Sequence, residues 1–191
     1  SLCHTLQEES ISAHVINEGD LMQVESVAQV PGCDIEIPNL EDTHWNWWMP
    51  KFISSTAQFQ NRETVQALLD PIIGFGQSEE RLAPPLATLC KTINMAFAAG
   101  INQVSTYLKW VKYTPAQYRE FNEYVGRLAV MLRGAENAAE IALYYPVGTF
   151  QANYLVSPEN GHSRVGKCAE LERTWSLAVQ RLFAAGYDFS F

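Results

Sequence analysis

Short apolar runs alternate with longer segments of helical periodicity along the chain. The runs that predict strands are residues 2–7, 33–37, 64–69, 101–108 and 139–145. The segments with helical spacing are residues 11–28, 51–60, 86–99, 115–133 and 167–185. Strands that alternate with helices in this way predict an α/β fold with a mainly parallel sheet covered by helices.

Capping and breaking residues mark the ends of several of these helices. Ser10 is a good N-cap for the first helix, and Gly19 predicts a break inside it. Pro50 and Pro115 suit the first positions of two later helices. Gly100 ends the helix before it as a C-terminal glycine.

The connections after three of the predicted strands are long. Residues 39–49 form a polar and aromatic loop, residues 71–85 contain two glycines and three prolines, and residues 147–166 are loop-rich. Long connections inside compact domains are often functional. We therefore expect a functional site where the strands end.

Carboxylates follow several of the predicted strands. Asp70 ends the run Glu63–Asp70 directly before Pro71, Asp34 follows Gly32 with Glu36 two residues later, and Glu8 and Glu9 follow the first run. The carboxyl ends of parallel strands meet at one edge, where (β/α) barrels place their chemistry. These acids are the candidates for catalysis, with Asp70 first. The alternatives are turn stabilisation for Asp70 and Asp34 and helix-dipole charges for Glu8 and Glu9.

Aromatic side chains accompany these acids. The loop after the second strand contains His44, Trp45, Trp47 and Trp48, and Tyr107 and Trp110 end the fourth strand. Indole and phenol rings stack on sugar rings, and His can bind hydroxyl groups. These residues are the candidates for sugar binding. The alternative is that some of the tryptophans fill the mouth of a barrel or an interface.

Charge and motif content exclude several classes of function. The net charge is −8 and the basic residues are scattered, which argues against nucleic acid and anionic membrane surfaces as partners. The four cysteines are far apart, so no zinc spacing is present and free thiols are favoured over disulfides. No nucleophile elbow occurs, and Gly74-Phe-Gly76 lacks the rest of a dinucleotide motif. We expect neither a cofactor nor a metal.

Neither a signal peptide nor a membrane-spanning apolar run is present. Ser1 is not a natural start, so the chain fits a processed or excised segment. Localisation therefore stays open between the cytoplasm, the periplasm and secretion.

Short motifs along nearly the whole chain resemble α-L-rhamnosidase-like bacterial glycoside hydrolases, which have a (β/α)8 catalytic barrel. The matching stretches are Cys3–Ile11, Gly19–Met22, Val30–Asp34, Pro50–Ala57, Gly100–Asn102, Phe121–Leu128, Ala139–Pro146 and Gly186–Phe189. The resemblance implies that residues 1–134 are the C-terminal half of such a barrel, with about four βα units. It implies that residues 135–191 begin a flavodoxin-like or amidotransferase-like accessory domain.

The resemblance also implies a function. The chain would be a glycoside hydrolase (a glycosidase) that degrades plant-type oligo- or polysaccharides with a pair of strand-end carboxylates. One departure stands out: the related enzymes carry Ser-Glu at the end of the seventh strand, where this chain has Ala67-Leu68-Leu69-Asp70. The alternative is therefore a non-catalytic sugar-binding or structural fragment of such an enzyme. Half a barrel leaves open sheet edges, so we expect self-association or pairing with the missing half.

Overall fold

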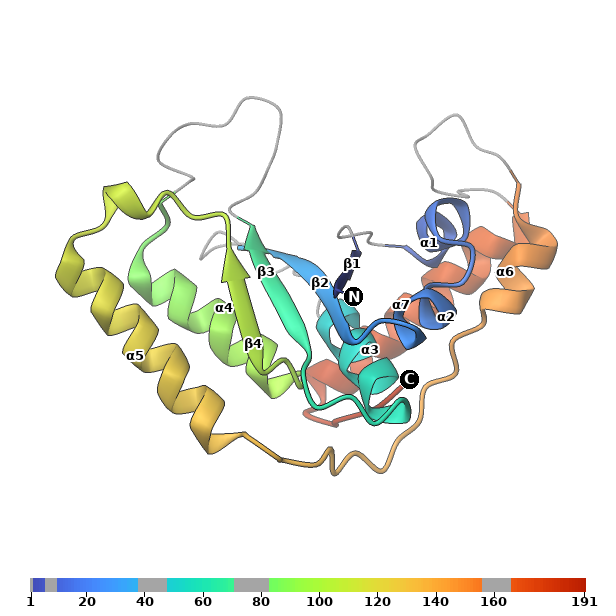
Figure 1. Cartoon of the computed structure of the whole chain (residues 1–191). Helices are drawn as coiled ribbons and strands as arrows, with labels where there is room; N and C mark the ends of the chain where they lie inside the picture. The colour runs from blue at the N-terminus through green and yellow to red at the C-terminus, as the bar shows by residue number, and fades with distance from the viewer. Residues whose placement is uncertain (1, 6–9, 38–47, 71–82, 156–165) are drawn as a thin grey trace. The chain divides into compact units, whose positions relative to one another are not determined.

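The computed structural model describes residues 2–5, 10–37, 48–70, 83–155 and 166–191, and within them it confirms an α/β fold. Figure 1 shows the helices and the parallel sheet. The strands are β1 (Leu2–Thr5), β2 (Val30–Glu36), β3 (Gln66–Asp70) and β4 (Gln103–Thr106). The helices are α1 (Ile11–Asn17), α2 (Leu21–Ser26), α3 (Trp48–Phe59), α4 (Leu86–Ala98), α5 (Pro115–Met131), α6 (Val147–Asn153) and α7 (Gly166–Ala184), with a short 3-10 helix at Trp110–Lys112.

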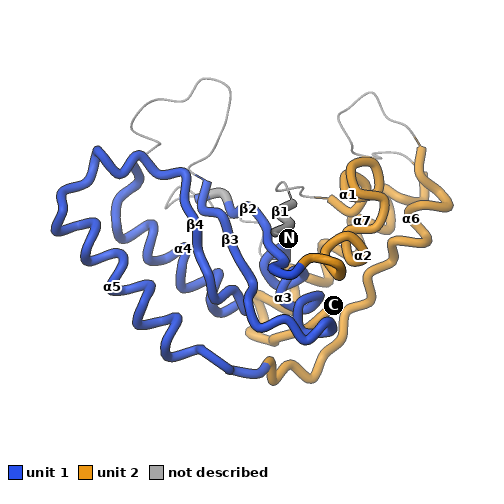
Figure 2. The backbone as a smooth tube through the Cα atoms, viewed as in Figure 1, with its two compact units in different colours: residues 1–7, 29–136 blue, residues 8–28, 137–191 orange. Residues whose placement is uncertain are grey.

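The chain forms two compact units, which Figure 2 colours separately. Unit 1 consists of residues 1–7 and 29–136, and it contains the sheet with α3, α4 and α5. Unit 2 consists of residues 8–28 and 137–191, and it contains α1, α2, α6 and α7. The division into domains at residues 134 and 135 that the resemblance implies stays a prediction.

The sheet of unit 1 has the strand order β1-β2-β3-β4, and every pairing is parallel. Neighbours in the sheet are therefore neighbours in sequence. Two further bonds extend the pairing past the strand ends: Ile37 N donates to Asp70 O at 2.9 Å, and Tyr107 N donates to Leu69 O at 3.0 Å. The second bond places Tyr107 beside Asp70 in the register.

Alternation along the strands gives the sheet one strongly apolar face. Cys33, Ile35, Ala67 and Leu69 share this face by register and are buried. The connections β2–α3–β3 and β3–α4–β4 run in the same direction across the sheet, and right-handed crossovers then put both helices on one face. Helix α3 packs on β2, so the apolar face is the face that the helices cover.

The end of α4 is fixed to the start of β4. Gly100 has a φ of 101°, and Asn102 joins the segment before β4 to the segment before β3: its Nδ2 donates to Glu63 O at 2.7 Å and its Oδ1 accepts from Val65 N at 2.9 Å. The side chain of Asn102 thus has a structural role at the start of the strand.

Helix α5 begins with a capping box at Thr114 and Gln117, and it packs against α4. Tyr124 Oη donates to Asn94 Oδ1 at 2.6 Å between these helices. Phe121 is the one buried residue of α5. The helix therefore covers α4 with a narrow stripe.

Within unit 2, polar side chains join helices that are far apart in sequence. Ser12 Oγ donates to Glu172 Oε2 at 2.6 Å, and His14 Nδ1 lies 3.4 Å from Tyr145 Oη. Burial and the nearby acids, Asp20 foremost, raise the pKa of Tyr145. The phenol therefore stays neutral in this polar packing.

Several predicted element boundaries are confirmed. Ser10 caps α1 by accepting from Ala13 N at 3.1 Å, and Gly19, with a φ of 78°, separates α1 from α2. As predicted, Gly100 follows the C-terminus of α4 and Pro115 begins α5. Cys33, Cys90 and Cys168 have free thiols, as their spacing predicts.

Three predictions about local structure are wrong. Residues 139–145 form no strand and make only an isolated parallel bridge, Ala142 to Ser190. The segment predicted as loop at 147–166 contains α6, whose Phe150 is completely buried. Helix α3 begins at Trp48, inside the predicted loop 39–49, because Trp48 and Met49 are buried with the helix.

Candidate functional site

The candidate site lies on the sheet face opposite the apolar one, at the carboxyl ends of the strands. Two rows of residues cross the sheet here. The Asp34 row consists of Asp34, Leu68 and Ser105, and the Asp70 row consists of Glu36, Asp70 and Tyr107. Residues that pair directly in a parallel sheet share a face. The register therefore brings Asp34 and Asp70, two predicted catalytic acids, onto the same face of adjacent strands.

Asp70 is more deeply buried than Asp34. Its side chain is 7% exposed, and its Oδ1 accepts no hydrogen bond from the residues that the structure describes. Buried carboxylate oxygens are normally satisfied by donors, since an unpaired one is costly. An enclosed carboxyl oxygen with unused hydrogen-bonding capacity can accept a hydrogen bond from a ligand.

The environment of Asp70 raises its pKa from 3.8 to about 6. Desolvation by burial is the larger cause, and the negative charge of Asp34 is the second. Both causes act in the same direction because each destabilises the ionised form of Asp70. At near-neutral pH, Asp70 can therefore hold a proton, whereas a fully solvated aspartate would have lost it.

Further polar residues line the same face. Gln66 is buried and lies two residues before Leu68 on β3. Ser105 is half-buried in the Asp34 row. Both are absent from the residues that the sequence predicts for the site. The signal for them is the period of two along β3 and β4, which puts Gln66 in phase with Asp70 and Ser105 in phase with Tyr107.

Several predicted site residues lie outside the described residues. Glu8, Glu9, His44, Trp45 and Trp47 belong to this group. Their predicted roles in catalysis or sugar binding stay predictions.

The described aromatic candidates lie in three different environments. Trp48 is buried at the start of α3, with its ring edge-to-face on Phe52 at 5.9 Å. Trp110 donates from Nε1 to Thr106 Oγ1 at 3.0 Å and packs on Phe121 at 5.5 Å. Tyr107 is exposed in the Asp70 row. The register thus brings Tyr107 to the acids, while Trp48 and Trp110 take part in packing.

Two negative findings apply to the described part of the chain. No group of three or more His, Cys, Asp or Glu side chains lies close enough together there to hold a metal ion. Within the same residues, no helix combines the length and the apolar character that crossing a membrane requires.

Comparisons of the chain with protein-family models, curated proteins and solved structures found no match. The case for a function therefore rests on the residues of the site and on their chemistry.

Proposed function

We propose that this chain is part of a glycoside hydrolase and that Asp70 and Asp34 are its catalytic pair. The observation that carries the proposal is the state of Asp70: a buried strand-end carboxyl with a pKa of about 6 and an oxygen that no described residue bonds, beside a second carboxylate on the same face. Acid–base hydrolysis of a glycosidic bond requires two carboxyl groups, one that donates a proton and one that acts as base or nucleophile.

The environments of the two acids suggest their roles. Asp70 holds its proton at higher pH and would donate it to the departing glycosidic oxygen as the general acid. Asp34, whose negative charge raises the pKa of Asp70, would be the second carboxylate of the pair. The second carboxylate either activates water or attacks the sugar carbon.

The sheet topology supports a partial (β/α) barrel as the framework of this site. In a barrel each strand lies beside the next strand in sequence, and the order β1-β2-β3-β4 follows that rule. A doubly wound sheet instead reverses direction at a switch point. In a barrel the face with Asp34 and Asp70 would line the interior, and the strand ends would form the mouth.

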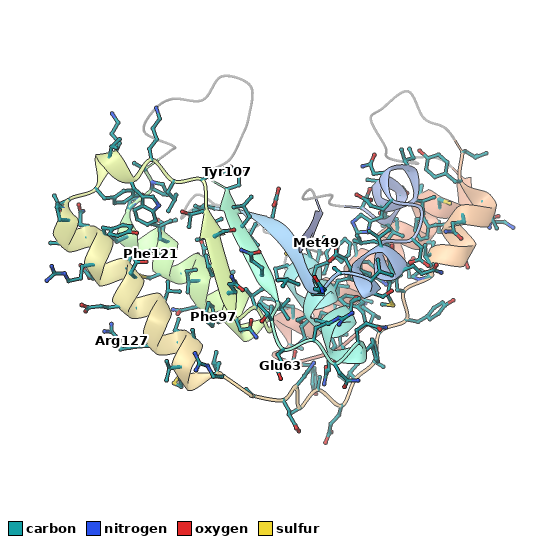
Figure 3. All side chains as sticks on the ribbon, in the orientation of Figure 1. Met49, Glu63, Phe97, Tyr107, Phe121 and Arg127 are labelled. Atoms are coloured by element: carbon teal, nitrogen blue, oxygen red, sulfur yellow. The ribbon has the colours of Figure 1, made fainter. Side chains whose placement is uncertain are left out.

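The experiment is a screen of 4-nitrophenyl glycopyranosides, beginning with the α-L-rhamnopyranoside that the resemblance suggests. On any substrate that the unmodified protein hydrolyses, Asp70→Asn should lower kcat by about 10²–10⁴-fold, the usual contribution of a positioned acid or base. The matched control is Glu63→Gln, since Glu63 is exposed and precedes β3, at the opposite end of the sheet from Tyr107 in Figure 3.

The outcomes separate the possible functions. Equal kcat in Asp70→Asn and Glu63→Gln would remove Asp70 from the mechanism. Binding of sugar without hydrolysis, measured by calorimetry on the unmodified protein, would favour the alternative of a non-catalytic sugar-binding fragment. Circular dichroism of both variants checks that a loss of activity does not come from unfolding.

A further inference from the structure

Tyr107 stands directly beside Asp70 at the end of the sheet. Its backbone N donates to Leu69 O at 3.0 Å, which continues the β3–β4 pairing by one residue. Directly paired residues on neighbouring strands have Cα atoms roughly 4.8 Å apart. Figure 3 shows Tyr107 at the end of the sheet where the strand arrows finish.

The side chain of Thr106, which precedes Tyr107, lies on the other face of the sheet. Thr106 pairs with Leu69 on the helix-covered face, and its Oγ1 accepts the hydrogen bond from Trp110 Nε1 at 3.0 Å. Trp110 in turn packs edge-to-face on Tyr118 of α5 at 4.9 Å. Alternation along the strand then puts the Tyr107 side chain on the face of Asp70.

The Tyr107 ring is available to a ligand. Tyr107 is 64% exposed, and within the described residues its side chain makes no hydrogen bond and no ring contact. Trp110, Tyr113 and Tyr118, which follow it closely in sequence, all have ring partners. Tyr107 thus differs from these neighbouring aromatic residues, because its ring is unpacked and lies beside a buried acid.

We propose that Tyr107 is the stacking platform on which a pyranose ring of the substrate lies while Asp70 acts on its glycosidic oxygen. This inference rests on the proposed function. The C–H face of a pyranose is apolar and packs on an aromatic ring, while the phenol hydroxyl can bind a sugar hydroxyl. Tyr107 thereby determines substrate affinity and orientation, and it takes no part in proton transfer.

The test compares three variants with 4-nitrophenyl α-L-rhamnopyranoside, or with whichever glycoside of the screen is hydrolysed. Tyr107→Ala should raise KM about tenfold and change kcat little, since an aromatic contact contributes about one such factor. Tyr107→Phe retains the ring and should restore KM to within about threefold of the unmodified protein. The matched control is Tyr187→Ala, because Tyr187 is 61% exposed and belongs to unit 2.

A second readout does not need turnover. Calorimetry with methyl α-L-rhamnopyranoside on Asp70→Asn should detect binding, and the double variant with Tyr107→Ala should bind about tenfold more weakly. Equal affinity in the two proteins, or an unchanged KM in Tyr107→Ala, would overturn the role of Tyr107. Full activity of Asp70→Asn would instead overturn the proposed function, so the two failures are distinguishable.

Discussion

Asp70 occupies a position in which its ionised form is disfavoured. Burial removes the carboxylate from water, Asp34 adds a like charge, and Oδ1 finds no donor among the described residues. A carboxyl group used as an acid near neutral pH needs such an environment, because a fully solvated aspartic acid has already lost its proton. The features that make Asp70 costly for folding are thus the features that suit it to proton donation.

The first prediction is that Asp70→Asn stabilises the protein at pH 7.5. The folded state holds the Asp70 proton up to a pKa of about 6, whereas an unfolded aspartate loses it near 3.8. Stability therefore falls as the pH rises from about 4 to about 6, and the deficit persists above this range. The neutral amide removes the deficit, and we expect a gain of roughly 1–3 kcal/mol in the free energy of unfolding.

Urea denaturation at pH 7.5 and at pH 3.5 measures this effect. At pH 3.5 the folded state holds the Asp70 proton and the unfolded state holds most of it, so the stabilisation by Asp70→Asn should largely disappear. Glu63→Gln serves as the control, because Glu63 is exposed. An Asp70→Asn variant that is less stable at pH 7.5 would show that the carboxylate is satisfied in the folded protein.

Individual residues of the site were predictable to different degrees. The position of Asp70 at a strand end follows from a local pattern, an apolar run closed by an acid and Pro71. The environments of Trp48 and Trp110 do not, because their partners Phe52 and Phe121 define them through packing. The joint placement of Asp34 and Asp70 needs the strand register, which a single sequence does not contain.

At the scale of elements, the turn from α4 into β4 depends on Gly100. Its φ of 101° is a conformation that residues with a Cβ rarely adopt. A Cβ built at this position would lie 2.7 Å from Ser54 Cβ and 2.8 Å from Ser54 Oγ. The close approach of α3 to this turn therefore requires glycine, which has no side chain, at position 100.

The second prediction is that Gly100→Ala destabilises the protein strongly. The expected loss is about 2–5 kcal/mol, from backbone strain together with overpacking against Ser54. Gly134→Ala is the matched control: Gly134 has a φ of 72°, but nothing lies within 4 Å of its Cβ position. Thermal melts should show the larger loss for Gly100→Ala, and equal losses would mean that backbone strain alone matters.

The register of β2 and β3 leads to a third prediction, about stereochemistry. Asp34 pairs with Leu68, so it lies one strand across and two residues back from Asp70. A strand spacing of about 4.8 Å and a rise of about 3.3 Å per residue give a Cα separation of about 8 Å. Side chains on one face of a sheet stand roughly perpendicular to it, so the two carboxyl groups should lie at a similar separation. That separation falls in the range of about 6.5–9.5 Å between the carboxyl groups of inverting enzymes, above the roughly 5–5.5 Å of retaining ones.

Hydrolysis by the Asp34 and Asp70 pair should therefore invert the anomeric centre. Proton NMR during the first minutes of hydrolysis, before mutarotation, identifies the anomer that is released. Release of the anomer with retained configuration would mean that another carboxylate attacks the sugar, because the two side chains of this pair start too far apart.

The elements that the sequence predicts incorrectly share a physical cause. Residues 139–145 are apolar enough for a strand, but among the described residues their β pairing is limited to Ser190, so no ladder forms there. Helix α6 contains Gly148 and has little helical propensity. It is anchored by buried Phe150, whose carbonyl lies 3.7 Å from Cys168 Sγ of α7. Tertiary contacts determine the structure of both segments, and the local sequence pattern does not reveal these contacts.

At the scale of the whole molecule, the α/β class was predictable because strand and helix periods alternate so regularly in residues 30–131. Among the described residues, β1 and β4 each pair with one neighbouring strand, so the sheet has two edges. Edge strands present unpaired backbone groups that can pair with another chain. The fourth prediction is therefore that the chain self-associates in solution.

The edge of β4 offers a direct test of this association. Gln103 N donates to Val65 O at 3.1 Å and Tyr107 N donates to Leu69 O at 3.0 Å, so the N–H groups of these residues face β3. By alternation, the N–H of Val104 faces the open edge. Proline is tolerated on an edge strand when the N–H it removes faces outward.

Val104→Pro should thus abolish association through this edge and keep the helical circular dichroism of the unmodified chain, whereas Gln103→Pro should destabilise the sheet itself. Light scattering coupled to size exclusion, over a hundredfold range of protein concentration, measures the oligomeric state of each. Association of Val104→Pro at the same concentrations as the unmodified chain would exclude the β4 edge. A chain that stays monomeric throughout would count against an incomplete barrel, because its sheet edges would then be tolerated without a partner.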